Sequence, residues 1–196
     1  VMNEGSSFPR ATITKTELQS RLLKALDRGD VWPAFQPIVD IRSGSLAGFE
    51  ILARGTDPEA GEISPAQFIP LLDKHQLVDS LLQELMRSAC AAAARWNGRF
   101  FLAFNVTPDQ LLSPDLPERL GTVAVKAGFP LSRVQLEITE SSLITDSTAA
   151  YQTLNRLNEI GVAIALDDFG TGYSSLARLV AFPFRKLKID AQFVQG

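Results

Sequence analysis

Short apolar runs alternate with stretches in which apolar residues recur every three or four positions, and this pattern predicts the elements of the chain. Residues 1–13 are polar and irregular, so we expect a flexible segment or linker there. Leucines then recur at helical spacing between Leu18 and Leu26, before Gly29 supplies a stop. The first predicted element is therefore a helix that ends near this glycine.

After this helix the pattern predicts a hairpin and then a repeated order of strand followed by helix. Turn residues around Gly44 separate the two hairpin strands, and Ser64 followed by Pro65 is typical of a helix start. The predicted elements are, in order, strands 34–41 and 46–54, helices from Ser64 and over 77–96, strand 100–106, helices from Thr107 and near Pro114, strand 134–139, helix 147–160, strand 162–167, helix 174–180 and strand 186–190. Nearly continuous apolar strands such as 162–167 are typical of parallel strands covered on both faces. The sequence thus predicts an α/β fold with a parallel sheet or barrel.

Composition and charge narrow the class of protein. The 196 residues are 45% hydrophobic, which is enough for one domain with a sizeable core. The formal net charge is −3 and no long run of like charge occurs, so we expect no binding to DNA or RNA and no membrane contact by this domain. No apolar run approaches the roughly 20 residues of a membrane span. We expect a cytoplasmic domain, which is compatible with a larger, membrane-bound protein.

The single cysteine and the single histidine suggest no chemistry. Cys90 lies in an alanine-rich run, so we expect an inert packing residue. His75 lies in a predicted helix or loop, and we expect a surface or capping residue. Because zinc sites favour histidine and cysteine ligands, the sequence offers little support for a zinc site.

Polar residues stand inside or at the carboxyl ends of the later strands. They are Glu50, Asn105, Glu137, the adjacent pair Asp167 and Asp168, and Lys188. A charge in an apolar strand is costly unless it is paired or bound to a metal, and a single case would most often be a structural ion pair. Repetition over five strands favours one shared site instead. Successive β/α units would bring these side chains together at the carboxyl end of a barrel.

The donor atoms of this predicted site are carboxylate and amide oxygens, which suit Mg²⁺ or Mn²⁺. A bend between Asp167 and Asp168 would let the two carboxylates serve neighbouring ions, and two ions about 4 Å apart can stabilise a phosphoryl displacement. An isolated Asp-Asp pair is more often a turn or a helix cap. The segment 169–173, with two glycines and a threonine, favours a mobile functional loop here.

Two cations are best placed to meet phosphate oxygens. Arg54 follows Glu50 in the same apolar run, and Lys188 lies within the last predicted strand. Either residue could instead be an ion-paired or solvated strand-end residue. Together with metal ions, the two side chains would offset the repulsion between a phosphodiester and the many carboxylates.

Several separated motifs resemble those of the EAL domains of bacterial cyclic di-GMP phosphodiesterases, in the same order. They are Phe35-Gln36-Pro37-Ile38-Val39, Glu50-Ile51-Leu52-Ala53-Arg54, Phe104-Asn105-Val106-Thr107, Leu136-Glu137-Ile138-Thr139-Glu140-Ser141, the run from Leu166 to Leu176 and Leu187-Lys188-Ile189-Asp190. The resemblance extends from about Leu18 to Val194, and we expect the domain to occupy 14–196. The family signature Glu-Ala-Leu stands here as Glu50-Ile51-Leu52, which keeps the glutamate. The resemblance implies a TIM-like (β/α) barrel whose first strand runs antiparallel, in agreement with the predicted hairpin.

The resemblance also implies a role for each site residue. The implied metal ligands, for two Mg²⁺ or Mn²⁺ ions, are Glu50, Asn105, Glu137, Asp167 and, on the second ion, Asp168. The implied catalytic residues are Lys188, which would hold or help to activate the attacking water, Asp168 and Glu50. The implied contacts to the dinucleotide are Gln36, Leu52 and Arg54. Glu140 would anchor the loop that runs from Asp168 to Tyr173.

The implied activity is metal-dependent hydrolysis of cyclic di-GMP to linear pGpG. A receptor that binds cyclic di-GMP without hydrolysis is an alternative, and so is a protein-interaction domain, which intact ligand positions disfavour. The resemblance implies a homodimer that pairs through 171–180. A complete barrel of this type needs about 250 residues, so we expect the barrel to be incomplete and its last strands to be absent after Gly196. A glutamate and a glutamine that the family uses would lie in that absent quarter.

Overall fold

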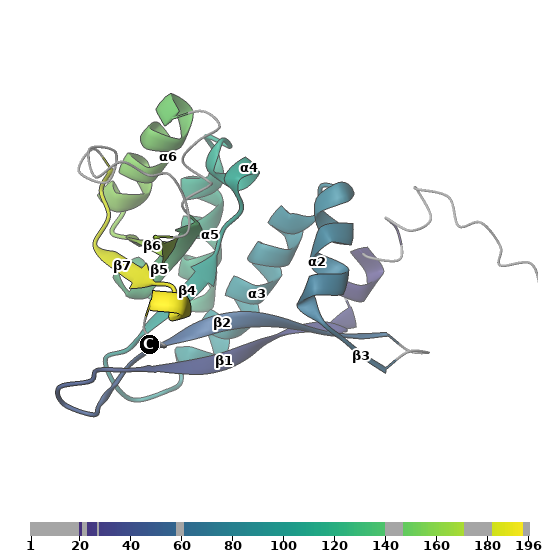
Figure 1. Cartoon of the computed structure of the whole chain (residues 1–196). Coiled ribbons are helices and arrows are strands. Elements are labelled where there is room, and N and C mark those ends of the chain that lie inside the picture. Colours follow the sequence, from purple (N-terminus) through teal and green to yellow (C-terminus); the bar gives the residue numbers. More distant parts are fainter. Residues whose placement is uncertain are drawn as a thin grey trace, which may run out of the picture.

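The computed structural model describes residues 20, 23–26, 28–57, 61–139, 147–170 and 182–193. Its framework is a mixed sheet with helices packed against it (Figure 1). The strands lie side by side in the order β1 (Val31–Val39), β2 (Leu46–Asp57), β4 (Phe101–Asn105), β5 (Val134–Thr139), β6 (Ala163–Phe169) and β7 (Lys186–Ile189). Strand β1 is antiparallel to β2, and every later pair in this row is parallel.

This strand order confirms the predicted fold class, an incomplete TIM-like α/β barrel with an antiparallel first strand. Within the described ranges, β1 and β7 are the two edges of the row and do not pair with each other. The short strand β3 (Gly61–Ile63) lies off this row and pairs with the far end of β2. The expected linker, residues 1–13, lies outside the residues that the structure describes.

Helices connect the strands and pack against the sheet. They are α2 (Pro65–Lys74), α3 (Val78–Ala93), α4 (Pro108–Leu111), α5 (Leu116–Ala127) and α6 (Ser147–Glu159), with short 3-10 turns η1 (Leu131–Arg133) and η3 (Ala191–Phe193). Helix α3 contacts β1, β2 and β4, whereas α6 contacts β6. No helix in the described ranges is long and apolar enough to cross a membrane.

Local sequence explains where these elements begin and end. Pro65 opens α2, and the side chain of Gln67 accepts a hydrogen bond from the Ser64 backbone N–H at 3.2 Å. Gly128 ends α5 with a φ of 68°, a left-handed conformation that glycine adopts without a steric penalty. In the hairpin turn, the Asp40 carboxylate accepts hydrogen bonds from the backbone N–H groups of Arg42 and Ser43. The predicted boundaries at these points therefore rest on recognisable caps and turns.

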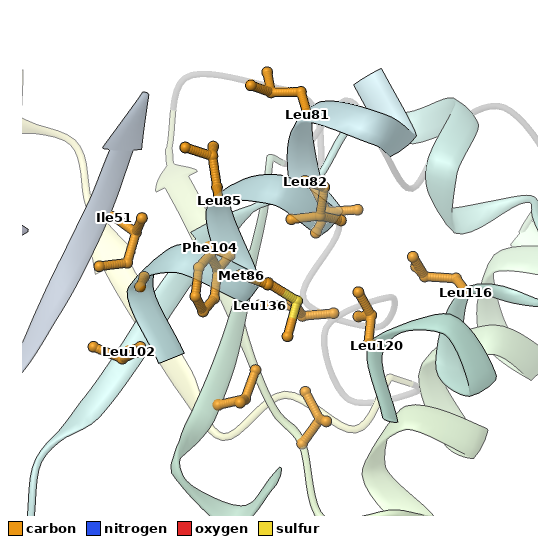
Figure 2. Packing of buried hydrophobic residues seen from close by; sticks show 14 of the residues in the cluster. Ile51, Leu81, Leu82, Leu85, Met86, Leu102, Phe104, Leu116, Leu120 and Leu136 are labelled. Carbon is orange, nitrogen blue, oxygen red and sulfur yellow. The ribbon is translucent and has the colours of Figure 1, made fainter. Parts of the chain in front are cut away.

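The hydrophobic core lies between the sheet and the helices (Figure 2). Its buried side chains include Ile51, Leu102, Phe104 and Leu136 from strands, and Leu81, Leu82, Leu85, Met86, Leu116 and Leu120 from helices. Because successive strand side chains alternate between faces, the core position of Leu136 sends Gln135 and Glu137 to the opposite face, the inner face of the barrel. The packing of the core thereby determines which polar side chains lie on the inner face of the barrel.

Cys90 and His75 both belong to the interior. Cys90 is fully buried in α3, as expected for a packing residue, and burial raises the pKa of its thiol to about 12. His75 forms the C-cap of α2, which confirms the capping alternative, but its side chain is only 4% exposed. Of the two expected positions for His75, cap or surface, the structure therefore has the cap.

Most predicted elements are present, but several boundaries differ, including those of β1, which spans Val31–Val39 rather than 34–41, and of β2, which ends at Asp57 rather than Arg54. Strand β3 was not predicted, because its three residues carry a single apolar side chain. Strand β6 continues two residues past Asp167 to Phe169, and α3 ends at Ala93 rather than near Trp96. The predicted helix 174–180 lies outside the part of the chain that the structure describes.

Candidate active site at the strand ends

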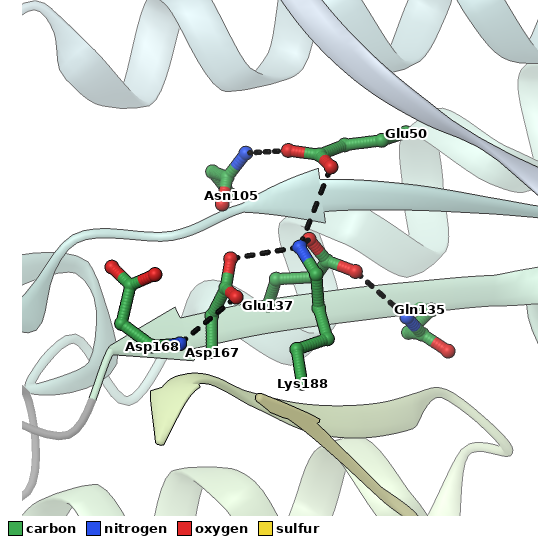
Figure 3. Close-up of polar contacts among 7 residues, drawn as sticks. All are labelled: Glu50, Asn105, Gln135, Glu137, Asp167, Asp168 and Lys188. Atoms are coloured by element: carbon green, nitrogen blue, oxygen red, sulfur yellow. Dashed lines mark hydrogen bonds and ion pairs between the residues drawn. The ribbon is translucent and has the colours of Figure 1, made fainter. Parts of the chain in front are cut away.

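Five polar side chains from five parallel strands gather at the carboxyl end of the sheet (Figure 3). They are Glu50 on β2, Asn105 at the end of β4, Glu137 on β5, Asp167 on β6 and Lys188 on β7. Strand register accounts for much of this meeting, because Asn105 stands directly opposite Glu137, and Thr139 stands opposite Asp167. The residues that the sequence pattern grouped together are thus neighbours in space.

The ammonium group of Lys188 is the centre of this cluster. Its Nζ donates to Glu137 Oε2 at 2.5 Å and to Asp167 Oδ2 at 2.8 Å, and it lies 3.4 Å from Glu50 Oε2. On the other side of Glu50, Asn105 Nδ2 donates to Oε1 at 3.1 Å. One cation is therefore shared by three carboxylates that come from three different strands.

Burial and charge act against each other in this cluster. The side chain of Glu137 is fully buried, and this burial raises the pKa of its carboxyl group although Lys188 works in the opposite direction. Burial alone would lower the pKa of Lys188, but the hydrogen bonds to Asp167 and Glu137 hold it above its ordinary value. The carboxylates and the ammonium group therefore form one interdependent unit.

Asp167 and Asp168 lie at an irregularity in β6. The register with β7 shifts between Leu166 and Phe169, and Asp168 has a φ of 54°, in the left-handed region. The backbone N–H of Asp168 donates to Asp167 Oδ1 at 2.9 Å, and the two side chains leave the strand in different directions (Figure 3). Burial, together with the charges of Asp167 and Asp190, raises the pKa of the Asp168 carboxyl group. The bend that the adjacent aspartates suggested is present, while the use of Asp168 for a second ion stays a prediction.

Two of the three expected substrate contacts border a cavity beside the cluster. Leu52 and Arg54 line this space of about 320 Å³, together with Asn105 and Glu137. The Arg54 guanidinium donates to the Ala53 carbonyl at 2.8 Å. The third expected contact, Gln36, lies on β1 opposite Glu50 and is exposed. Glu140 and residues 171–173 of the expected loop lie outside the described residues, so their roles stay predictions.

Gln135 is a site residue that the sequence pattern did not single out. Its Nε2 donates to Glu137 Oε1 at 2.9 Å, and the residue is only 2% exposed. A glutamine two positions before a glutamate matches no motif of a catalytic site. The usable signal was the alternation of strand side chains, which puts Gln135 on the same face as Glu137.

The donor chemistry of the cluster fits a hard divalent cation. Within the described ranges, no three His, Cys, Asp or Glu side chains surround a common point as metal ligands. The carboxylates of Glu50, Glu137 and Asp167 converge instead on the Lys188 ammonium, which is itself a cation. Carboxylate oxygens and the amide oxygen of Asn105 are donors that Mg²⁺ and Mn²⁺ accept. The residues therefore fit such an ion by donor type.

Fold and site together define an α/β barrel domain with an acidic cluster at the ends of its parallel strands. The sequence matches the EAL domain family over residues 19–196, and the chain belongs to this family. This match confirms the resemblance inferred from the motifs.

Relatives and solved structures agree with this assignment. The cyclic di-GMP phosphodiesterase RocR of Pseudomonas aeruginosa is 38% identical over 177 residues, which cover 89% of this chain and 45% of RocR. The PaMucR phosphodiesterase in complex with c-di-GMP has a TM-score of 0.84 at 33% identity, covering 91% of this chain and 74% of that chain. BlrP1 of Klebsiella pneumoniae, in a complex with calcium and cyclic di-GMP, has a TM-score of 0.75 at 31% identity, covering 87% and 43% of the two chains. This chain spans between about a fifth and less than half of the curated relatives that it matches.

Proposed function

We propose that the protein containing this chain is a metal-dependent phosphodiesterase that hydrolyses cyclic di-GMP to linear pGpG. The observation that carries the proposal is the gathering of Glu50, Asn105, Glu137, Asp167 and Lys188 at one strand end. The similarity to RocR and to the MucR phosphodiesterase supports the same activity.

The proposed cofactor is a pair of Mg²⁺ or Mn²⁺ ions. Glu50, Asn105, Glu137 and Asp167 would hold the first ion, and Asp168 would serve the second. Such ions supply Lewis-acid stabilisation of the negative charge on the phosphate oxygens during displacement. The calcium in the BlrP1 complex supports a divalent cation in this family without identifying the ion for this chain.

Side chains of this chain would position the water and the phosphate. Hydrolysis forms a bond between phosphorus and the water oxygen, breaks the bond between phosphorus and one ribose oxygen, and leaves a proton on that ribose oxygen. Lys188 would hold the attacking water, and the carboxylate of Asp168 or Glu50 would take its proton. The rigid strands that carry these groups would keep them oriented for the reaction.

The cavity beside the cluster is the proposed entry for part of the substrate. Apolar side chains of Ile69, Leu81 and Leu85 form much of its wall, and such a wall suits the face of a purine base. Arg54 lies at the same cavity, where its guanidinium would meet a phosphate or a base edge. Gln36 would contact the dinucleotide from the neighbouring strand.

A receptor that binds cyclic di-GMP without hydrolysis is the second candidate. The observation that favours it is the occupation of the carboxylate cluster by Lys188, which already neutralises groups that would hold an ion. Both candidates use the same binding surface, and they differ only in whether a divalent ion displaces these ammonium contacts.

One experiment separates the candidates. The full-length protein would be incubated with cyclic di-GMP and either Mg²⁺ or Mn²⁺, and pGpG would be measured by chromatography. We expect turnover that EDTA abolishes and that Asp167→Asn reduces by at least about a hundredfold, because a ligand charge is lost. Binding of cyclic di-GMP without turnover under either ion would establish the receptor, and absence of binding would exclude both candidates.

We also propose that the protein acts in the cytoplasm as a homodimer. Residues 171–180, through which we expect the pairing, lie outside the described part of the chain. The net charge of −3 without long runs of like charge supports a partner other than nucleic acid. Light scattering of the full-length protein would test the dimer, and a monomer at high concentration would exclude it.

A further inference from the structure

We propose that Gln135 is a positioning residue for Glu137, fixing the carboxylate so that only one of its oxygens faces a cation. This inference rests on the proposed metal-dependent function and acts through Glu137 alone. Gln135 Nε2 donates to Glu137 Oε1 at 2.9 Å, while Lys188 Nζ donates to Glu137 Oε2 at 2.5 Å (Figure 3). Each oxygen of the buried carboxylate therefore has its own donor on its own side.

The chemistry of the two groups determines the orientation of the Gln135 amide. If the amide were turned over, its oxygen would face Glu137 Oε1 at the same distance, and two acceptors would repel each other. Only the orientation with Nε2 toward the carboxylate makes a bond. Gln135 consequently acts as a neutral donor that engages Oε1 without cancelling the negative charge needed for a cation.

Stability alone does not account for a glutamine at this position. Gln135 is 2% exposed, and its Oε1 has no hydrogen-bond partner among the described residues. A buried acceptor without a partner is destabilising, so an apolar side chain of similar length would be the more stable choice. The neighbours across the sheet, Ala103 and Ala163, are small apolar residues that offer no polar partner. Among the described residues, the bond to Glu137 is the only interaction that explains the amide.

The position of Gln135 on β5 fixes its side chain relative to the Glu137 carboxylate. Gln135 and Glu137 are two residues apart, so both side chains leave the same strand on the same face. The intervening Leu136 is fully buried on the opposite face, where it anchors the strand in the core. Core packing thus holds the strand backbone, whereas the Gln135 amide holds the carboxylate group of Glu137 itself.

The test compares two methionine substitutions at adjacent positions. Gln135→Met keeps the length of the side chain and removes the donor, whereas Leu136→Met alters the core behind the same strand without touching Glu137. Both variants and the wild type would be made in the full-length protein. Mn²⁺ binding would be measured by the electron paramagnetic resonance signal of the free ion, without substrate, and kcat and KM would be measured separately.

We expect Gln135→Met to weaken Mn²⁺ binding by about ten- to a hundredfold, the usual effect of losing a hydrogen bond to a metal ligand. Leu136→Met should leave Mn²⁺ binding within about twofold of the wild type, since its side chain does not reach the carboxylate. At saturating Mn²⁺, the KM for cyclic di-GMP should be the same in both variants. A thermal melt would confirm that each variant is folded at the assay temperature.

Other outcomes separate this inference from the proposed function. Equal Mn²⁺ affinity in Gln135→Met and Leu136→Met would overturn the positioning role, even if both enzymes hydrolyse cyclic di-GMP. Mn²⁺ binding that falls in Gln135→Met alone would support the role, even if the wild type proved to be a receptor without turnover. A wild type that does not bind Mn²⁺ would overturn the positioning role, because no ion would then be held by Glu137.

Discussion

At the scale of single residues, the ammonium group of Lys188 compensates the negative charge of the site. Three carboxylates lie within 3.4 Å of its Nζ, and its side chain is 31% exposed. Without a positive charge between them, three carboxylates gathered around one point repel one another. The cluster therefore needs a cation at its centre, whether that cation is the ammonium group or a metal ion.

Replacement of this lysine should make stability depend on metal. We expect Lys188→Met to lower the free energy of unfolding of the metal-free protein by about 2 kcal/mol, less than for a fully buried pair because the lysine is partly exposed. Addition of Mn²⁺ should restore more stability to this variant than to the wild type. Urea denaturation with EDTA and with Mn²⁺ would measure both effects. Lys126→Met, an exposed lysine on α5, is the control and should show neither effect.

Cys90 offers a second test at this scale, because it is the only cysteine. Burial raises the pKa of its thiol to about 12 from an ordinary value of 9.0, so the folded protein keeps a proton that the unfolded chain releases above pH 9. Its contribution to stability is therefore complete below pH 9 and is lost as the pH rises toward 12. We expect no reaction with iodoacetamide at pH 8 in the native protein and complete reaction in guanidinium chloride. Labelling of the native protein, measured by mass spectrometry, would contradict the buried position.

The sequence could identify the charged members of the site but not their contacts. Glu50, Glu137 and Lys188 stood out because charges in apolar strands require a partner. Which atoms meet depends on the stagger between strands, which a single sequence does not encode in any local pattern. Gln135 was missed for a different reason: its partner Glu137 lies on the same strand, but a neutral side chain in a strand gives no warning that it has a partner. The roles of these residues in binding a metal ion stay predictions.

At the scale of elements, the closeness of β2 to β4 depends on a residue without a side chain. A Cβ atom on Gly48 would lie 2.7 Å from the Phe101 carbonyl oxygen and 2.8 Å from the Phe101 ring. Gly48 stands opposite Phe101 in the parallel register of the two strands. Glu50 follows two residues later on β2. The close approach at Gly48 therefore also fixes the position of Glu50 relative to β4.

Gly48→Ala should therefore destabilise the protein, by about 2 kcal/mol if the strands shift as in an overpacked core. On α5, Gly121→Ala is the matched control, since its Cβ would meet only Leu131 Cδ1 at an ordinary 3.9 Å. The free energy of unfolding of this control should rise by about 1 kcal/mol, because alanine has a higher helix propensity than glycine. Thermal unfolding of both variants measures the difference, and equal melting temperatures would contradict the close approach.

Elements with strong local signals were predictable, and those fixed by pairing were not. Helix α2 carries proline at its first position and a cap before it, and strand β5 begins and ends where its alternation of apolar and polar residues does. In contrast, β3 exists because Gly61–Ile63 pair with the end of β2, and β6 extends to Phe169 because a bulge keeps it beside β7. Both features depend on pairing with another strand: the directly preceding β2 for β3, and the later β7 for the end of β6.

At the scale of the whole molecule, the described strands form a row with two edges. On β7, the outer side chains of Leu187 and Ile189 are 50% and 62% exposed, and Phe193 of η3 is 61% exposed. The inner side chain of Lys188, on the same strand, instead enters the polar cluster. The barrel class was predictable from the order of strands and helices. The exposure of the apolar side chains on β7 was not, because it depends on which other parts of the protein pack against this strand.

The exposed side of β7 leads to a prediction for the 196-residue chain produced by itself. An unpaired strand edge with adjacent apolar side chains promotes association between molecules, so we expect this chain to self-associate as its concentration rises. The double substitution Leu187→Thr and Ile189→Thr places β-branched side chains suited to a strand at both positions and removes most of the apolar surface, so association should fall. Val125→Thr is the matched control, since Val125 is 75% exposed on α5, away from any sheet edge. Light scattering over a concentration series would compare the three chains. If the double variant associated as strongly as the control, the contact would have to lie elsewhere on the molecule and not at β7.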